Sequence, residues 1–196
     1  MSSGYGVNDF VVRFANVNGT GSASANTLFA KSIFRSGIPV SAKNIFPSNI
    51  QGLPTWYEVR VNGNGYLGRR EGINMMVSIN PQSTDQDLKN TAPGGYFLYD
   101  STWPLPKEKR REDLHYLEIP LMEMSNQNFS EPRFRQLFKN IIYVGALSAL
   151  LNIDRAIFEE LFKDQFPGKD KVVASNLKAL DLGINYAKEN WKCPLD

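Results

Sequence analysis

The sequence predicts an α/β fold: a mainly parallel, Rossmann-like sheet with helices on both faces and a C-terminal helical segment. Short apolar runs rich in β-branched residues alternate with helical patterns over residues 10–119. Beyond them the chain is helical throughout, and this alternation is typical of parallel sheets, whose strands need crossover helices. With 196 residues, 42% of them hydrophobic, we expect a single domain spanning residues 1–196.

The first strand and helix are predicted from residues 10–36. Residues 10–17 are apolar apart from Arg13 and Asn16, which indicates a mostly buried strand. Residues 23–36 carry apolar side chains near one face, as an amphipathic helix does. Gly37 follows as a left-handed cap, so the helix is expected to end there.

The middle of the chain predicts strands separated by irregular segments. Residues 38–41 form a short strand candidate, and residues 42–55 look irregular because they contain two prolines and a glycine. Residues 56–61 alternate like a strand, and the NGNG sequence at residues 62–65 predicts a hairpin. Residues 74–79 form another buried-strand run.

A short helix and two further strands complete the predicted sheet. Ser83 and Gln86 have the spacing of a capping box at the start of a helix over residues 83–89. Residues 95–99 and 114–119 are the two strand candidates.

Three helices are predicted near the C-terminus. The longest covers residues 133–151, with Pro132 in its favourable first turn. The next covers residues 155–162 and is capped by Asp154, and the last covers residues 169–190.

Composition excludes several classes of function. The net charge of +2 gives no electrostatic case for nucleic acid or a membrane as partner. The single cysteine, Cys193, excludes a disulfide framework and a cysteine-ligated cluster, and the single histidine, His115, leaves little for a metal site or triad. The apolar segment 141–151 is too short to span a bilayer, the N-terminus lacks a signal peptide, and a cytoplasmic location is expected. The basic run at residues 107–111 is predicted to be a solvated loop.

The turn between the first strand and the first helix is the leading candidate site. It consists of Asn18, Gly19, Thr20, Gly21 and Ser22. The first amides of a helix are unpaired and lie at the positive end of its dipole, and small residues let a phosphate approach them. The turn therefore predicts a phosphate-bearing ligand, although the glycines also suit a tight turn that binds nothing.

The residues around the turn exclude some classes of phosphate-bearing ligand. No G-K-[ST] follows it, so it is not a nucleotide triphosphatase loop, and Lys43 stands near the position where an NAD site has a carboxylate. A second candidate is the irregular, aromatic part of residues 43–61, where Ser48, Asn49 and Gln51 offer hydrogen bonds to a cofactor or protein partner.

Residues 10–31 and 36–70 resemble the gamma domain of the 2-oxoacid:ferredoxin (acceptor) oxidoreductases, the pyruvate/ketoisovalerate oxidoreductase gamma-like family. The form most similar is fused at the N-terminus of a 2-oxoglutarate-type alpha subunit, and the resemblance extends over residues 9–191. Enzymes of this family oxidatively decarboxylate a 2-oxoacid, transfer the acyl group to coenzyme A and pass electrons to ferredoxin.

The resemblance implies that this chain is a non-catalytic domain that contributes to coenzyme A binding and subunit assembly, and that it is an N-terminal fragment of a longer alpha subunit. It places the turn 18–22 against the coenzyme A diphosphate, with Lys43 and the segment 48–51 near it or at a domain interface. Where many gamma domains carry Arg-Gly-Gly before the third strand, this chain has Gln51-Gly52-Leu53.

The resemblance also assigns the redox cofactors and partners to other parts of the enzyme. Thiamine diphosphate, magnesium and iron–sulfur clusters are expected on other domains or subunits, because this chain has neither a cysteine set nor a G-D-G motif. The expected partners are the thiamine-binding alpha and beta portions, and ferredoxin for the complex. The isolated chain, with no catalytic or metal-binding residue assigned, is predicted to be inactive. The alternatives are a free-standing nucleotide- or flavin-binding module and a purely structural assembly domain.

Overall fold

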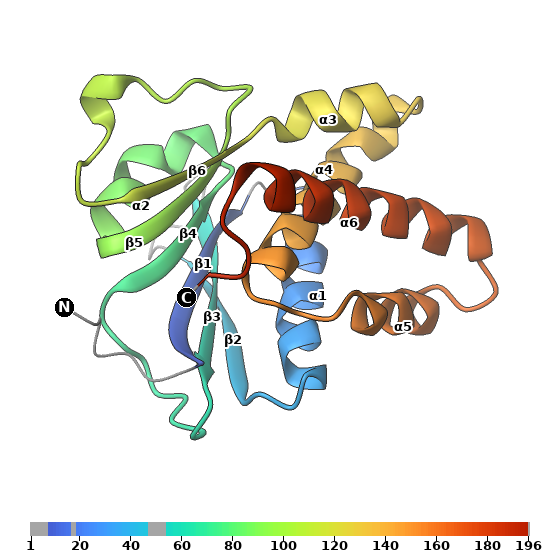
Figure 1. Ribbon diagram of the computed structural model, residues 1–196, viewed down its shortest axis with the longest axis horizontal. Coiled ribbons are helices and arrows are strands. Elements are labelled where there is room, and N and C mark those ends of the chain that lie inside the picture. Colours follow the sequence, from blue (N-terminus) through green and yellow to red (C-terminus); the bar gives the residue numbers. More distant parts are fainter. Residues whose placement is uncertain (1–7, 17–18, 47–53, 196) are drawn as a thin grey trace. The chain divides into compact units, whose positions relative to one another are not determined.

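The computed structural model describes residues 8–16, 19–46 and 54–195 (Figure 1). The chain divides into two compact units. The sheet unit comprises residues 1–17 and 37–118, and the helical unit comprises residues 18–36 and 119–196. A single domain over residues 1–196 stays a prediction, and the two units are described in turn.

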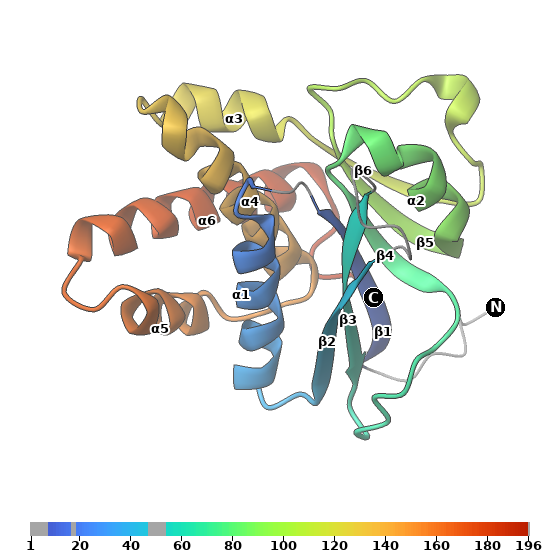
Figure 2. The same cartoon turned by 180° about the vertical axis from the view of Figure 1, so that it is seen from behind.

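The sheet unit is built on six strands in the order β2-β3-β1-β4-β5-β6 (Figures 1 and 2). Their bounds are β1 Asp9–Asn16, β2 Val40–Ile45, β3 Thr55–Asn62, β4 Ile73–Ser78, β5 Thr91–Asp100 and β6 His115–Ile119. Strand β3 is antiparallel to both β1 and β2, whereas β4 is parallel to β1 and to β5. Strands β1, β2, β4 and β5 therefore share one direction, which confirms the mainly parallel α/β class.

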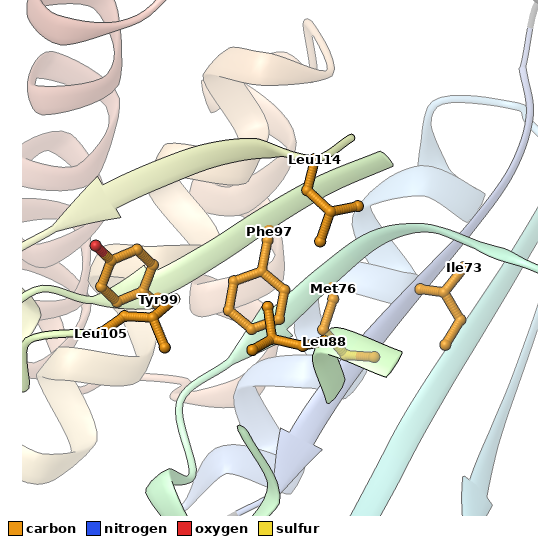
Figure 3. Packing of buried hydrophobic residues seen from close by; sticks show 7 residues of the cluster. All are labelled: Ile73, Met76, Leu88, Phe97, Tyr99, Leu105 and Leu114. Carbon is orange, nitrogen blue, oxygen red and sulfur yellow. The ribbon is translucent and has the colours of Figure 1, made fainter. Parts of the chain in front are cut away.

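A compact apolar cluster fills part of the sheet unit (Figure 3). Strands β4 and β5, the short helix α2 (Thr84–Asn90) and the segment after β5 all contribute side chains to it. The members are Ile73, Met76, Leu88, Phe97, Tyr99, Leu105 and Leu114. Helix α2 is thus held on the sheet by an apolar contact through Leu88, as an amphipathic crossover requires.

The hairpin predicted at residues 62–65 is wrong. The turn forms, because Asn62 Oδ1 accepts hydrogen bonds from the amides of Asn64 and Tyr66, each at 3.0 Å. The chain then continues to β4, which pairs with β1 and is not a neighbour of β3. The turn itself was predicted correctly, but which strands pair is decided by the whole sheet and not by the local turn.

The capping box predicted at Ser83 is also wrong, although the helix that it precedes is present. The Ser83 side chain makes no cap bond to α2. Its hydroxyl donates instead to Asp87 Oδ2 at 2.8 Å and to the Asn80 carbonyl at 3.1 Å. The side chain that caps locally is Asn80, whose Oδ1 accepts from the Gln82 amide at the short 3-10 turn Pro81–Ser83.

The helical unit contains α1 and four helices from the C-terminal part of the chain. Their bounds are α1 Ser22–Arg35, α3 Leu121–Asn128, α4 Pro132–Leu150, α5 Arg155–Gln165 and α6 Asp170–Asn190. Helix α3 was not predicted. Pro132 opens α4, and Asp154 caps α5 by accepting from the Ala156 amide at 2.9 Å, so both predicted helix starts are confirmed. Among the described residues, no helix has the length and apolar character needed to cross a bilayer.

Helices α4 and α6 pack side by side with their backbones in contact (Figure 1). A Cβ added to Gly183 would lie 2.7 Å from the Ala146 amide nitrogen, and one added to Gly145 would lie 2.9 Å from the Leu180 carbonyl carbon. Glycine is therefore required at both positions by the approach of the two helices.

Candidate functional site

The predicted phosphate turn is a left-handed turn at the start of α1. Gly19 has φ +77° and Gly21 has φ +79°, and residues that carry a Cβ rarely adopt this backbone conformation. Gly21 is the N-cap residue, has no side-chain cap, and leads into a first helical turn without an acidic residue. A Cβ at Gly21 would strike the Leu137 side chain of α4, so this glycine also permits close packing.

Helix α4 holds this turn through two buried polar contacts. Asn140 Nδ2 donates to the Thr20 carbonyl at 2.8 Å, and the Tyr143 hydroxyl donates to Asn26 Oδ1 at 2.7 Å. Asn140 is 1% exposed and Tyr143 is fully buried. Both are polar groups in or beside the most apolar segment of the chain, for which the sequence predicts only a core helix.

The exposure of the turn decides which of its groups an anion could meet. Gly19 is exposed, Thr20 and Gly21 are half-buried, and Ser22 is only 3% exposed. Ala23 and Ser24 are again exposed on the first turn of α1. A phosphate at this place would therefore meet backbone amides at the positive end of the α1 dipole, because the Ser22 side chain is buried.

A large hollow, which we call the helical groove, lies beside the turn in the helical unit. Its volume is about 630 Å³, within the range of ~300–1,000 Å³ typical of ligand pockets. It is lined from α1, α4, α5, α6 and the segment between α3 and α4. Its lining includes Gly21, Ser24, Phe134, Leu137, Phe138, Phe166, Lys171 and Val172.

Five phenylalanines contribute to the walls of the helical groove. Phe129 stacks on Phe138 with ring centroids 4.0 Å apart, and Phe134 lies 6.2 Å from Phe138. Phe162 and Phe166 of α5 also line the groove. Sequence reasoning missed this feature, although the phenylalanines of residues 129–138 were its visible signal.

Lys43, the predicted cationic member of the site, lies on β2 in the sheet unit. Its ammonium is 3.6 Å from Glu58 Oε1, and Glu58 also accepts from Arg13 Nε at 3.0 Å. Glu58 is 4% exposed, so the two cations neutralise a buried carboxylate. Lys43 thus has a structural partner in its own unit. The other predicted site residues, Asn18, Ser48, Asn49 and Gln51, lie outside the described residues.

A buried carboxylate in the sheet unit was not predicted. Asp87 is 0% exposed and accepts from Trp56 Nε1 at 2.7 Å, Ser78 Oγ at 2.7 Å and Ser83 Oγ at 2.8 Å. Burial raises the pKa of Asp87 above its ordinary value, and the three hydrogen bonds offset only part of this. Trp56 is 5% exposed and serves as a donor in this network.

The basic run at residues 107–111 is only partly a solvated loop. Residues 107–109 are exposed, as predicted. Arg111 instead donates to the Leu88 carbonyl at 2.6 Å and to the Thr91 carbonyl at 2.8 Å, and Arg110 donates to the Tyr99 hydroxyl at 2.6 Å. The solvated-loop prediction is therefore wrong for these two arginines, which tie α2 and β5 to the following segment.

Within the described ranges, no three histidine, cysteine, aspartate or glutamate side chains gather as a metal site would require. Sequence reasoning assigned no metal-binding residue to this chain.

Comparison with known proteins identifies relatives along almost the whole chain. The family model described as pyruvate ferredoxin/flavodoxin oxidoreductase matches residues 11–186. Ketoisovalerate oxidoreductase subunit VorA from Methanothermobacter thermautotrophicus is 28% identical over 118 residues, which are 59% of this chain and 23% of VorA. The chain thus spans about a quarter of that relative's length.

Two solved structures share the fold. The 2-oxoglutarate:ferredoxin oxidoreductase from Magnetococcus marinus, solved with 2-oxoglutarate, coenzyme A and succinyl-CoA bound, is 29% identical with a TM-score of 0.80, over 95% of this chain and 32% of that chain. The gamma subunit of a keto/oxoacid ferredoxin oxidoreductase from Geobacter sulfurreducens is 18% identical with a TM-score of 0.74, over 92% of this chain and 99% of that subunit. The same fold is thus a separate subunit in one protein and part of a longer chain in another. Since the family model covers all but the ends of the sequence, this chain belongs to the pyruvate ferredoxin/flavodoxin oxidoreductase family.

Proposed function

We propose that this chain is the non-catalytic, gamma-type part of a thiamine diphosphate-dependent 2-oxoacid:ferredoxin oxidoreductase, where it contributes to coenzyme A binding and subunit assembly. The observation that carries the proposal is the similarity over 95% of the chain to the Magnetococcus enzyme, which was solved with coenzyme A and succinyl-CoA bound. The enzyme would convert a 2-oxoacid and coenzyme A to acyl-CoA and carbon dioxide, with the electrons passing to ferredoxin.

The part of this chain in the reaction is to hold coenzyme A. Its diphosphate would lie at the turn 19–21, at the positive end of the α1 dipole, where the N-cap residue has no side-chain cap and the first helical turn has no competing acidic residue. Asn140 and Tyr143 fix the start of α1 against α4 through the bonds to Thr20 and Asn26. A positioned turn binds an anion without first having to be ordered, which favours affinity.

The redox chemistry belongs elsewhere in the enzyme. Thiamine diphosphate supplies the electron sink for decarboxylation when it is bound. The residues of this chain do not fit the redox groups, because its one cysteine cannot ligate a cluster. We therefore place thiamine diphosphate, magnesium and the clusters on the thiamine-binding parts of the enzyme, with ferredoxin as the partner of the complex.

The test is binding of coenzyme A by calorimetry and thermal shift, with the chain alone and together with its thiamine-binding partners. 3′-Dephospho-coenzyme A, ADP, NAD and FMN are the comparators. We expect coenzyme A to stabilise the complex more than NAD or FMN. A preference for FMN or for plain nucleotides would favour a free-standing flavin or nucleotide module instead.

The decisive variant is Ala23→Glu, which adds a carboxylate to the exposed first turn of α1. An acidic residue there favours the helix but repels a phosphate, so folding should be retained while the affinity for coenzyme A falls about tenfold or more. Ala174→Glu on the exposed face of α6 is the matched control and should bind normally. If both variants bind coenzyme A equally well, coenzyme A does not bind at the turn.

A further inference from the structure

The helical groove has exposed apolar side chains among its lining residues. Leu137 is 43% exposed and Val172 is 37% exposed, and both line the groove. Behind them lie the five phenylalanines at positions 129, 134, 138, 162 and 166. A hollow lined by apolar side chains is a candidate place for another molecule to bind.

The helical groove is lined by side chains from several helices. Side chains from the start of α1, the first half of α4, the end of α5 and the start of α6 all line one open hollow of about 630 Å³. A hollow lined by several helices is the usual seat of an amphipathic helix, which enters such a groove with the side chains of one face.

Charged side chains also line the helical groove and bear on what could bind there. Besides neutral hydroxyls and amides, the groove is lined by the charged side chains of Glu131 and Lys171. Glu131 is paired with Arg133 at 3.0 Å. Among the described residues no ion pair involves Lys171, which is exposed at the start of α6. The rim therefore offers a cation to a carboxylate of the occupant.

We propose that the helical groove seats an amphipathic helix from the thiamine-binding part of the same oxidoreductase, with its apolar face in the groove and a carboxylate at its edge against Lys171. This rests on the proposed function. The relatives are much longer than this fold, since this chain spans only 23% of VorA and 32% of the Magnetococcus chain. Most of each relative thus lies outside this fold and is available to cover the groove.

The first test is assembly of the complex after co-expression with the thiamine-binding parts of the enzyme. Val172→Glu introduces a charge at the rim of the groove and should weaken assembly at least about tenfold, measured by analytical ultracentrifugation. Lys171→Glu should weaken it about three- to fivefold through charge repulsion. Phe34→Glu is the matched control, because Phe34 is a 69% exposed apolar residue of α1 in the same unit and does not line the groove.

Hydrogen exchange gives the second test and serves equally if the parts are joined in one polypeptide. In the complex, amides of residues 128–141 and 162–176 should exchange more slowly than in the isolated chain, and those of residues 31–35 should not change. Val172→Glu and Lys171→Glu are both at exposed positions, and circular dichroism checks that these variants fold. Normal assembly of Val172→Glu, an equal defect in Phe34→Glu, unchanged exchange at the groove, or closure of the groove by a second copy of this chain would each overturn the proposal.

The two proposals fail separately. If Ala23→Glu leaves coenzyme A binding unchanged while Val172→Glu releases the thiamine-binding parts, the groove is an assembly surface and the coenzyme A assignment falls. If Ala23→Glu abolishes binding while Val172→Glu assembles normally, the coenzyme A assignment stands and the groove proposal falls.

Discussion

The sheet unit and the helical unit are stabilised by different kinds of contact. In the sheet unit, charged side chains are buried and satisfied: Asp87 by three donors, and Glu58 by Arg13 and Lys43. In the helical unit the closest packing joins backbone to backbone, where α4 and α6 meet at Gly145 and Gly183. Buried carboxylates with their partners distinguish the sheet unit, and the backbone-to-backbone helix crossing distinguishes the helical unit.

This difference bears on function. Buried polar groups restrict a region to one arrangement, because each of them is costly to leave without a partner. The network around Asp87 joins α2 to β3 and β4. The helical unit packs tightly at one crossing and opens at the other side into the helical groove, where Leu137 and Val172 remain exposed. A contact surface is expected there and not in the satisfied network.

The largest effect is expected from Gly183→Ala, which tests the steric half of this comparison. The new methyl group would lie 2.7 Å from the Ala146 amide nitrogen and 2.9 Å from the Ile142 carbonyl carbon, so backbone and not a flexible side chain has to move. We expect a loss of about 3 kcal/mol or more in the free energy of unfolding, measured by urea denaturation.

Gly68→Ala is the control for this change, because a Cβ at Gly68 meets nothing within 4 Å and its φ is not positive. It should unfold near the wild-type midpoint. An equal midpoint for Gly183→Ala would mean that α4 and α6 do not cross as closely as the structure shows.

A smaller but still large effect is expected from Asp87→Ala, which tests the polar half. The change leaves Trp56 Nε1 and the Ser78 hydroxyl buried without their acceptor, and the cost is about 2–4 kcal/mol in the free energy of unfolding. Asp85→Ala is the control in the same helix, since Asp85 is 77% exposed and pairs only at the surface with Lys109. Removing that pair should cost no more than about 1 kcal/mol.

The same carboxylate should leave a signature in the pH dependence of stability. The pKa of Asp87 is raised in the folded state from its ordinary value of 3.8, so between the two values the folded protein holds more protons than the unfolded chain. The Asp87 contribution is therefore fully present below pH 3.8 and declines as the pH rises toward the folded-state pKa. Asp87→Asn should remove this decline, and an unchanged pH profile would show that Asp87 does not titrate as proposed.

Local signals in the sequence were sufficient for most elements but not for their partners. The helix starts at Pro132 and Asp154 were predicted, because each depends on residues within one turn. The hairpin at residues 62–65 was wrong, because whether β3 pairs with β4 depends on β1, far away in the sequence.

The candidate site shows the same limit. Gly19 and Gly21 were recognised as a turn by composition alone, and their positive φ angles confirm the local prediction. The support from Asn140, 120 residues away from Thr20, could not be predicted from spacing. The three donors to Asp87 lie 4, 9 and 31 residues away from it along the chain, and no motif joins them.

The smallest effect is expected at Asp154. Its carboxylate accepts a hydrogen bond as that of Asp87 does, but on the surface of the helical unit. Asp154 Oδ1 accepts from the Ala156 amide at 2.9 Å, but the group is exposed, so water replaces the bond when it is lost. Asp154→Ala should lower the free energy of unfolding by about 1 kcal/mol, and Asp154→Asn, which can still cap, should lose clearly less. If Asp154→Ala instead matches the loss at Asp87→Ala, burial is not what separates the two contacts, and the distinction drawn between the units fails.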